Sequence, residues 1–251
     1  MKRHELTQYL DDYLEIDKFD DSSQNGLQVE GPEEVTKVAF AVDACQASFD
    51  QAVDAGAQLL FVHHGLFWKD PLRLVGPHFH RVRTLIEGEC GLYAVHLPLD
   101  AHPEVGNNAV LARRLGLRGS HPFAEYHGQK IGVAGELNPP VEIPALIGRL
   151  VQILNVPPLR VLAHGPEGAK HVGCISGGAA SMIDKAEAAG LDTYITGETS
   201  HTFFHQAAER GLNVLFCGHY ATETLGVRAV ARHLEATFDL ETLFLDVPTG
   251  M

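Results

Sequence analysis

The sequence predicts an α/β fold composed of two similar halves, and three observations support this prediction. Apolar strand-like runs alternate with helical segments from Val35 onward. The second half of the chain repeats the order of strands and helices found in the first. The segment QAVDAG at 51–56 is matched by KAEAAG at 185–190, and each is followed by a strand-like run and a polar motif. This pattern indicates an internal duplication with right-handed crossovers and with ligands at the carboxyl ends of the strands.

The first α/β lobe is expected to span residues 1–125. Its first segment carries leucines and tyrosines at helical spacing, which predicts an amphipathic helix. A connector with an Asn25-Gly26 turn signal follows. The expected strands are 37–44, 58–65 and a run from Gly91 that ends between His96 and Asp100, and the expected helices are 47–55, 78–89 and 105–115.

Residues 126–251 are expected to form a linking segment and the second α/β lobe. The stretch 120–165 contains three proline-rich clusters, two candidate strands and one candidate helix, so it should extend a sheet rather than form a third domain. The lobe itself should contain strands within 171–179, 192–198 and 213–217, a helix that ends near 190, a helix over 201–210 and a last long helix to Glu235.

Composition excludes several classes of function. The chain has 251 residues and a formal net charge of −13, which disfavours a nucleic acid as partner and leaves no polybasic membrane patch. No signal-peptide core and no 18-residue apolar run occurs, so neither secretion nor membrane spanning is predicted. The cysteines are far apart and form no metal-binding motif, which predicts reduced thiols in a cytoplasmic protein, and Cys217 is expected to pack in the core.

Two adjacent histidines end one of the predicted strands. Residues 60–65 read LFVHHG, so a buried strand ends in His63, His64 and a glycine. Neighbouring side chains alternate faces along a strand, and at its end the two rings could flank a cleft and bind two different metal ions. The alternative is that one ring packs in the core and the other is hydrogen-bonded at the surface.

Two further strand ends carry residue types that bind metals. The run 91–102 places Asp100 between two histidines, and the run 213–226 enters a helix in which Glu223 lies four residues after His219. That spacing puts both side chains on one helical face. Together with His63 and His64, these residues form a nitrogen and oxygen ligand set large enough for two divalent ions, which could be zinc, manganese, iron, cobalt or nickel. Since the ligands come from both halves, the site is expected between them.

Other polar residues at the strand ends are candidates for proton transfer. Glu198 and His201 follow a fourth predicted strand, and we expect them to act as general acid or base. Alternatively, Glu198 caps the next helix and His201 lies on its surface. His96 is a third candidate for proton transfer; like His102, it could instead hold a ligand through an outer hydrogen bond.

Four motifs in order along the chain resemble one known family. They are NGLQVEG at 25–31, FVHHGLFW at 61–68, HLPLDAHP at 96–103 and GHYATE at 218–223. This combination is similar to the Nif-three-like (Ngg-interacting factor three) family, including its YbgI group of GTP cyclohydrolase I type 2 homologues. The resemblance implies two similar intertwined α/β lobes with a dinuclear metal site in the cleft between them, and a ring-shaped (toroidal) homohexamer.

The resemblance also implies a role for each ligand. His64 and Asp100 would hold one metal, His63 and His219 the other, and Glu223 would bridge the two. Gly65 stands where many relatives have proline, which changes a loop residue but no ligand.

Two functions of different classes follow. The first is a metal-dependent hydrolase, in which two ions lower the pKa of a bound water from about 15.7 toward 7. Its substrate would be a nucleotide or another small polar molecule, and GTP is the candidate that the resemblance names. The second is a ring-shaped metal-binding scaffold or interaction protein without turnover.

Overall fold

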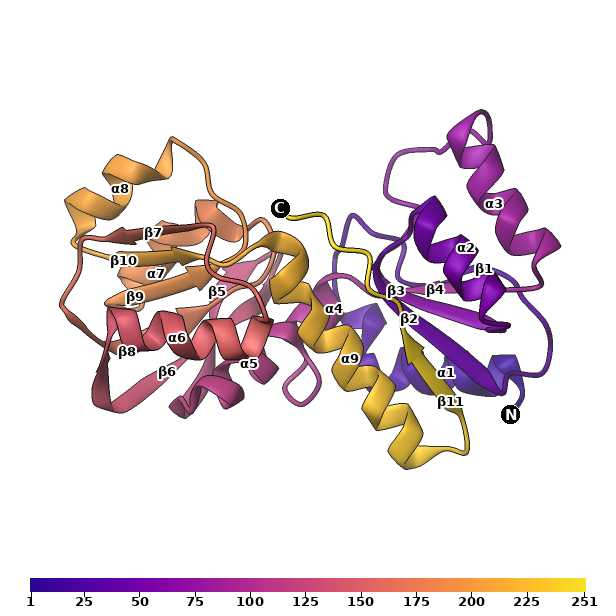
Figure 1. Cartoon of the computed structure of the whole chain (residues 1–251), viewed down its shortest axis with the longest axis horizontal. Helices are drawn as coiled ribbons and strands as arrows, with labels where there is room; N and C mark the ends of the chain where they lie inside the picture. The colour runs from indigo at the N-terminus through magenta and orange to yellow at the C-terminus, as the bar shows by residue number, and fades with distance from the viewer. The chain divides into compact units, whose positions relative to one another are not determined.

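The computed structural model describes residues 1–251, and its strands form two sheets in two compact units (Figure 1). Unit 1 comprises residues 1–99 and 227–247, and unit 2 comprises residues 100–226 and 248–251. Strands alternate with helices in both units, so the predicted α/β fold with two lobes is confirmed. None of the helices combines the length and the apolar composition that crossing a membrane requires.

The boundaries of the units differ from the predicted division between residues 125 and 126. Strand β5 (Arg118–Tyr126) pairs with β6 (Gln129–Glu142) and so belongs to unit 2. Strand β11 (Glu241–Phe244) pairs in parallel with β2 (Lys37–Asp43), which returns the C-terminal segment to unit 1. Both assignments depend on a strand partner rather than on position along the chain, and for β11 that partner is far away in sequence.

Unit 1 contains a five-stranded sheet in the order β1-β4-β3-β2-β11. Strand β3 pairs in parallel with β2 and β4, and β1 is antiparallel to β4. The remaining elements of this unit are β1 (Gly26–Val29), β3 (Leu59–His64), β4 (Gly91–Ala94), α1 (Arg3–Leu14), η1 (Ile16–Lys18), α2 (Gln46–Asp54), α3 (Pro77–Glu87) and the later part of α9 (His219–Thr237).

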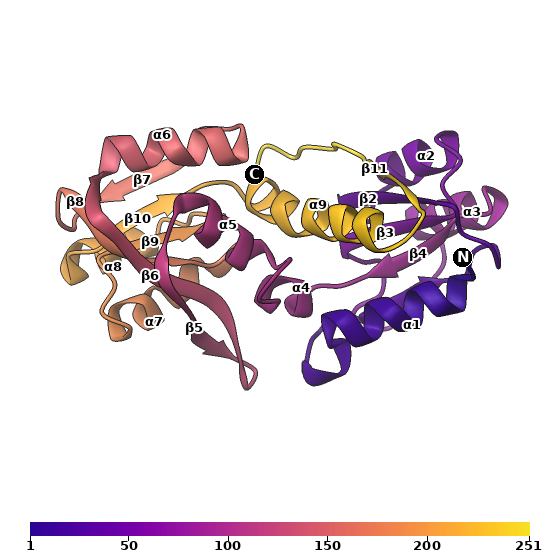
Figure 2. The same cartoon turned by 90° about the horizontal axis from the view of Figure 1, so that it is seen from below.

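The two faces of this sheet are covered by different helices, with α2 and α3 on one side and α1 on the other (Figure 2). Strand side chains alternate between the faces, so Leu60 and its neighbours pack in one apolar cluster with residues of α2 and α3. On the opposite face the buried rings of Phe40, Phe61 and Tyr93 follow one another with centroids 5.2 and 5.6 Å apart. The Tyr93 hydroxyl donates a 2.7 Å hydrogen bond to Asp11 of α1. This row of rings therefore ties three strands to the first helix.

Unit 2 contains a six-stranded sheet in the order β5-β6-β8-β9-β10-β7. Strand β9 is parallel to β8 and β10, and β7 is antiparallel to β10. Helix α6 lies on one side of the sheet and α7 and α8 on the other (Figure 2), while α5 packs on α6 and β6. The elements are β7 (Arg160–Ala163), β8 (Gly168–Cys174), β9 (Thr193–Thr196), β10 (Asn213–Phe216), α5 (Asn107–Leu115), α6 (Ile143–Leu154), η2 (Ala179–Met182), α7 (Ile183–Ala188) and α8 (Phe203–Arg210). Helix α4 (Leu97–Ala101) begins in unit 1 and ends in unit 2.

The two sheets share a four-stranded repeat, which supports the predicted internal duplication. The strands β1 to β4 lie in the order β1-β4-β3-β2, and the strands β7 to β10 lie in the order β7-β10-β9-β8. In both repeats the first strand is antiparallel to the last, and the other pairs are parallel.

The strand registers also align the repeats residue by residue. Leu59 pairs with Val38 and with Gly91, and Thr193 pairs with Val172 and with Asn213. Leu59 and Thr193 therefore occupy the same place in the two sheets. Counting along the strands from these pairs gives two further correspondences, His64 with Glu198 and Asp43 with Gly177.

Candidate metal centre

Three imidazole rings gather at the carboxyl ends of β3 and β4 in unit 1. One ring nitrogen from each of His63, His64 and His96 lies within 4.8 Å of the others. The ring centroids are 4.7 Å apart for His63 and His64, 5.3 Å for His63 and His96, and 5.6 Å for His64 and His96. His63 is fully buried, and His64 and His96 are partly exposed. His63 thus lies in the core and His64 reaches the surface, and their two rings lie beside that of His96.

Each of these three rings is oriented by a hydrogen bond from Nδ1 to an oxygen atom. Because a carbonyl or an ionised carboxylate can only accept, Nδ1 carries a hydrogen, which leaves Nε2 as the nitrogen that could bind a metal. This is the tautomer that binds metals through Nε2, and such outer partners are typical of metal-binding histidines. The Nδ1 acceptors are Val95 O for His63 at 2.9 Å, Asp43 Oδ1 for His64 at 2.8 Å and Asp21 Oδ1 for His96 at 2.9 Å.

Asp21 is a buried carboxylate that the sequence analysis did not single out. Its side chain is only 2% exposed, and it accepts hydrogen bonds from the backbone N–H groups of Ser23 and Leu97 and from Asn25 Nδ2. Burial raises the pKa of Asp21, but the His96 ring and the backbone donors outweigh burial and lower the pKa to about 2. Residues 21–25, which the sequence suggested were only a connector, therefore hold His96 in place.

A second set of donors lies at the start of α9 in unit 2. As the helical spacing predicted, His219 and Glu223 share one face, with His219 Nε2 3.0 Å from Glu223 Oε1. His219 Nδ1 lies 2.6 Å from Glu198 Oε1. Burial alone lowers the pKa of His219, but the Glu223 and Glu198 carboxylates outweigh it and raise the pKa to about 9. In the absence of metal, the structure thus favours an imidazolium between two carboxylates; metal binding would displace the proton on Nε2.

Gly177 makes room for this pair. The residue has φ +67, and a Cβ atom at its position would lie 2.3 Å from Glu223 Oε1 and 3.2 Å from His219 Nε2. Any other residue at this position would place a Cβ atom against the Glu223 carboxylate and displace it. Glu223 itself is 2% exposed, so its charge is held in a site that water hardly reaches.

Asp100 lies on α4 rather than at the end of a strand, because β4 already ends at Ala94. Its Oδ1 accepts hydrogen bonds from Asn107 Nδ2 at 2.9 Å and from Ser176 Oγ at 2.8 Å. These two donors fix the carboxylate, which is 7% exposed. Neither Asn107 nor Ser176 was predicted, although Ser176 opens the glycine-rich turn that follows β8.

The other residues considered from sequence have distinct places. Glu198 follows β9, and its contact with Nδ1 of His219 orients that imidazole, which is itself a candidate metal ligand. His201 lies exposed in the turn before α8. His102 Nδ1 accepts the backbone N–H groups of Glu104 and Val105 at 3.2 Å each, which closes the turn after α4. Cys217 is fully buried, and burial raises the pKa of its thiol to about 12, as expected for a packing residue.

The donor chemistry fits divalent metal ions. Unit 1 supplies three imidazole nitrogens, and unit 2 supplies the carboxylates of Asp100 and Glu223 with the imidazole of His219. Mixed nitrogen and oxygen donors suit divalent first-row metals, and hydrogen bonds from outer partners orient His63, His64, His96, Asp100 and His219. The arrangement is therefore a candidate metal centre in both units.

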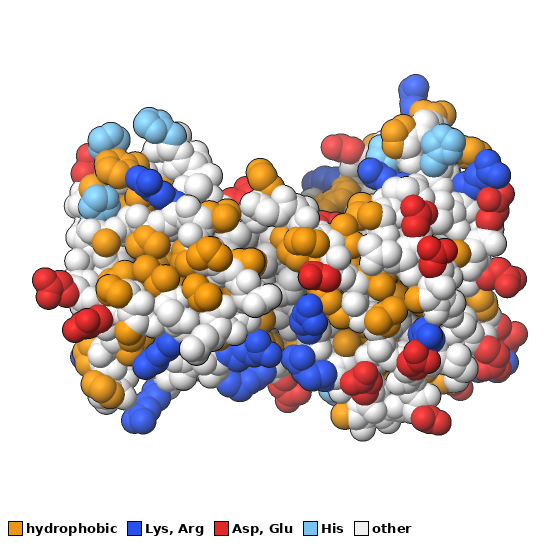
Figure 3. Space-filling model, in the orientation of Figure 1, with side chains coloured by type: hydrophobic (Ala, Val, Ile, Leu, Met, Phe, Trp, Pro, Cys, Tyr) orange, Lys and Arg blue, Asp and Glu red, His pale blue; other side chains and the backbone are white.

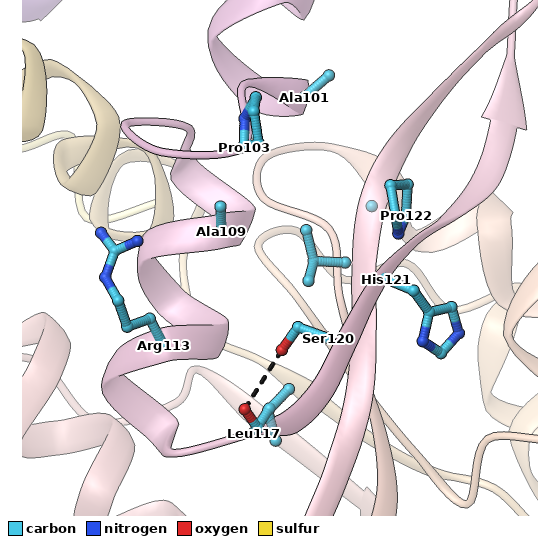
Figure 4. Close-up of a pocket in the computed structure, with 10 residues that line it drawn as sticks. Ala101, Pro103, Ala109, Arg113, Leu117, Ser120, His121 and Pro122 are labelled. Atoms are coloured by element: carbon cyan, nitrogen blue, oxygen red, sulfur yellow. Dashed lines mark hydrogen bonds between the residues drawn. The ribbon is translucent and has the colours of Figure 1, made fainter.

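A separate cavity of about 370 Å³ opens in unit 2 between α5 and the β5-β6 hairpin (Figure 4). Its wall is mostly apolar, and the Ser120 hydroxyl on it donates to the Leu117 carbonyl at 3.3 Å. Arg113 and His121 point away from each other rather than toward a common point (Figure 4). None of the predicted site residues lines this cavity. A site for catalysis needs converging polar groups, which this cavity lacks.

Comparison with known proteins gives a consistent result over the whole chain. The Duf34/NIF3 (NGG1p interacting factor 3) family model matches residues 1–250. A Deinococcus radiodurans protein named GTP cyclohydrolase 1 type 2 homolog is 46% identical over 249 residues, which cover 99% of this chain and 94% of that protein. A solved structure from Thermus thermophilus is 47% identical, covers 100% of both chains and has a TM-score of 0.92. The structure of protein ybgI, described as of unknown function, is 41% identical, covers 99% of both chains and also has a TM-score of 0.92.

Proposed function

The chain belongs to the Duf34/NIF3 family, and we propose that it is a dinuclear metal-dependent hydrolase of a nucleotide or another small polar molecule. The observation that carries this proposal is the set of donors at the strand and helix ends, where each histidine is held by an outer oxygen in the tautomer or orientation that a metal ligand needs. Histidines that served only to fill an apolar core would not need these hydrogen bonds.

In this proposal the donors of both units bind two divalent ions. His64 and Asp100 would hold one ion, His63 and His219 would hold the other, and Glu223 would be shared by both. Two bound ions would supply Lewis acidity that activates water and stabilises the negative charge that develops on the substrate. Glu198 keeps His219 oriented through its Nδ1 contact, and Asp43 does the same for His64.

Charge favours a small substrate over a nucleic acid. Unit 1 has 20 Asp and Glu residues against 10 Lys and Arg, and unit 2 has 12 against 9, so unit 1 in particular would repel a phosphate backbone. The curated relatives carry the name GTP cyclohydrolase 1 type 2 homolog, and GTP is therefore the first substrate to test. The four free cysteines are consistent with the reducing conditions of the cytoplasm.

The test is turnover of a panel of nucleotides, phosphoesters and amides by protein reconstituted separately with zinc, manganese, iron, cobalt and nickel. At least one substrate should be hydrolysed at a rate that falls to background when the metal is removed by chelation. If the metal-loaded protein turned over no member of the panel, the result would favour the alternative function, a metal-binding scaffold without turnover.

The proton carrier is tested on whichever substrate reacts. We expect His201→Gln to keep both metals and to slow turnover by roughly 100-fold, the usual contribution of a general acid or base. His205→Gln, which changes a histidine on the neighbouring helix α8, is the matched control. Full activity in His201→Gln would leave His201 a surface residue.

The second candidate is a ring-shaped scaffold, and assembly into a homohexamer is proposed for either function. Hydrophobic side chains gather on the face of unit 2 where α6 lies (Figure 3). Within α6 and directly after it, Val151, Val156 and Leu159 are 37%, 38% and 51% exposed, and exposed apolar side chains are typical of an interaction surface. Light scattering at micromolar concentration should give six times the 27.3 kDa chain mass, and a monomeric mass would remove the proposal.

A further inference from the structure

We infer that Trp68 is a specificity-determining residue, whose indole ring stacks against a planar heteroaromatic ring of the substrate. This inference rests on the proposed function, because it takes the substrate to be bound at the metal centre. It narrows the substrate from any small polar molecule to one that carries a nucleobase or another flat ring. Trp68 is the last residue of the motif FVHHGLFW and follows the histidine pair by four residues.

The first argument is the position of the indole ring beside the histidines of unit 1. Its centroid lies 5.1 Å from that of His96, with the two ring planes at 71°, and 6.2 Å from that of His64, with the planes at 37°. Neither imidazole lies parallel to the indole, and Trp68 is partly exposed. Part of the indole surface is therefore free to contact a ligand that is bound at the neighbouring metal donors.

The second argument is that the fold itself holds Trp68 in place. The indole Nε1 donates a 3.0 Å hydrogen bond to the Gly65 carbonyl, and Gln24 Nε2 donates a 3.1 Å hydrogen bond to the Trp68 carbonyl. Gln28 Oε1 accepts the backbone N–H groups of the two residues before Trp68, at 2.7 and 3.2 Å. Because the loop is already ordered by these contacts, a ligand that stacks on the indole would lose little affinity to ordering it.

The third argument is the chemistry that an indole face favours. Nucleobases stack on aromatic side chains, and one such contact raises affinity by roughly 5- to 100-fold. A cation can also bind to an indole face, but divalent ions at the neighbouring donors would repel it. A ligand with a flat ring and negatively charged oxygen atoms suits both neighbours, since the ring contacts the indole and the oxygen atoms contact the ions.

The experiment compares three probes on the full-length, zinc-loaded protein. They are guanosine 5′-monophosphate, ribose 5-phosphate, which lacks the ring, and guanosine, which lacks the phosphate. Calorimetric titration should show that guanosine 5′-monophosphate binds roughly 5- to 100-fold more tightly than ribose 5-phosphate. Trp68 is the chain's one tryptophan, so its fluorescence reports on stacking directly. Guanosine 5′-monophosphate should quench this fluorescence and ribose 5-phosphate should not, and quenching by guanosine as well would extend the ligand class from nucleotides to nucleosides.

Substitutions separate stacking from a purely structural role of the indole. In Trp68→Leu the preference for guanosine 5′-monophosphate should disappear, while the zinc content and the affinity for ribose 5-phosphate stay unchanged. Trp68→Tyr keeps an aromatic face and should retain most of the preference. Phe79→Leu, which changes an exposed ring of α3 in the same unit, is the matched control. If Trp68→Leu does not fold, the fluorescence titration of the unaltered chain decides the question.

Several results would overturn the inference. These are equal affinities for guanosine 5′-monophosphate and ribose 5-phosphate in the unaltered chain, binding of none of the three probes, and an unchanged preference in Trp68→Leu. A loss of zinc in that variant, or an equal loss of affinity for both phosphates, would instead assign Trp68 to holding His96. Failure of the proposed hydrolysis is distinguishable, because these titrations measure binding only. A protein that prefers the ring but turns over no substrate would count against hydrolysis alone.

Discussion

The two repeats have the same strand order but carry different chemistry at equal positions. Strand β3 ends at His64, and the equivalent position in the second repeat is Glu198, two residues after β9. At the end of β2 stands Asp43, and Gly177 takes its place after β8. In the first repeat, Asp43 supports the imidazole of His64. In the second, the glycine leaves space for Glu223, and Glu198 supports the imidazole of His219.

This difference shows how one duplicated scaffold can supply two kinds of donor. Unit 1 offers imidazoles, and their Nδ1 atoms are held by the carboxylates of Asp43 and Asp21 for His64 and His96 and by the Val95 carbonyl for His63. Unit 2 offers carboxylates directly, held by neutral amide and hydroxyl donors such as Asn107 and Ser176 on Asp100. Imidazoles select borderline metals, whereas carboxylates neutralise the ion's charge. The repeated fold determines the positions of the donor residues. The residue type at each position then determines which metals that donor prefers.

The largest effect is expected where the carboxylate of unit 2 is removed. Glu223→Gln keeps the shape of the side chain but removes its charge, and we expect one of two metal equivalents to be lost, with its affinity lowered by roughly 100-fold or more. Elemental analysis of fully loaded protein, purified without a histidine tag, measures this. Glu209→Gln on the exposed surface of α8 is the control. If Glu223→Gln kept both equivalents, the bridging role would be wrong.

The features that could be predicted from sequence are those set by short-range geometry. The spacing of His219 and Glu223 places them together because a helix brings residues four apart onto one face. The strands that carry His63 and His64 and that precede His219 show as continuous apolar runs because both of their sheet faces are buried. The β11 strand escaped prediction because it is short and owes its place to pairing with β2.

The outer partners of the histidines were harder to predict, for a related reason. Asp21 contacts His96 across a large sequence separation, so no local spacing in the sequence indicates this contact. The segment around it has turn-forming residues and no periodicity, which resembles a connector. Asp43 did carry a signal, since it ends a strand beside the one that ends in His64. An acidic residue at the end of a neighbouring parallel strand is a clue that sequence analysis could use.

A smaller effect is expected from the outer carboxylates, and it tests whether the two units are supported equally. Asp43→Asn and Glu198→Gln each leave an acceptor for Nδ1 but make the ligating nitrogen of His64 or His219 less basic. Each should lower zinc affinity by roughly 10- to 100-fold without removing a ligand. Competition with a chelator measures both. If one substitution had no effect while the other did, the support would be confined to one repeat.

The smallest effect concerns stability in unit 1 and its dependence on pH. Burial raises the pKa of Asp11, the hydrogen bond from Tyr93 opposes this, and the nearby Asp17 and Asp12 add to the rise. A raised pKa means that the folded state is penalised once Asp11 ionises, so the free energy of unfolding falls as pH rises through that pKa. Asp11→Asn removes the charge and keeps an oxygen for the Tyr93 hydroxyl. We expect it to stabilise unit 1 at pH 7 by less than about 1 kcal/mol, because Asp11 is only partly buried.

The sign of this effect separates it from a simple loss of packing. Below about pH 3 the carboxyl is protonated in the folded and unfolded chains alike, so the advantage of Asp11→Asn should vanish there. Urea unfolding at both pH values, followed by the fluorescence of Trp68, reports on unit 1 because this is the chain's one tryptophan. Asp12→Asn on the exposed side of the same helix is the control. Lower stability of Asp11→Asn at pH 7 would show that the hydrogen bond to the ionised carboxylate outweighs the cost of burying it. The row of rings in the sheet would then be anchored to α1 by a charge, unlike Tyr194 of unit 2, whose hydroxyl donates to the neutral carbonyl of Ala179.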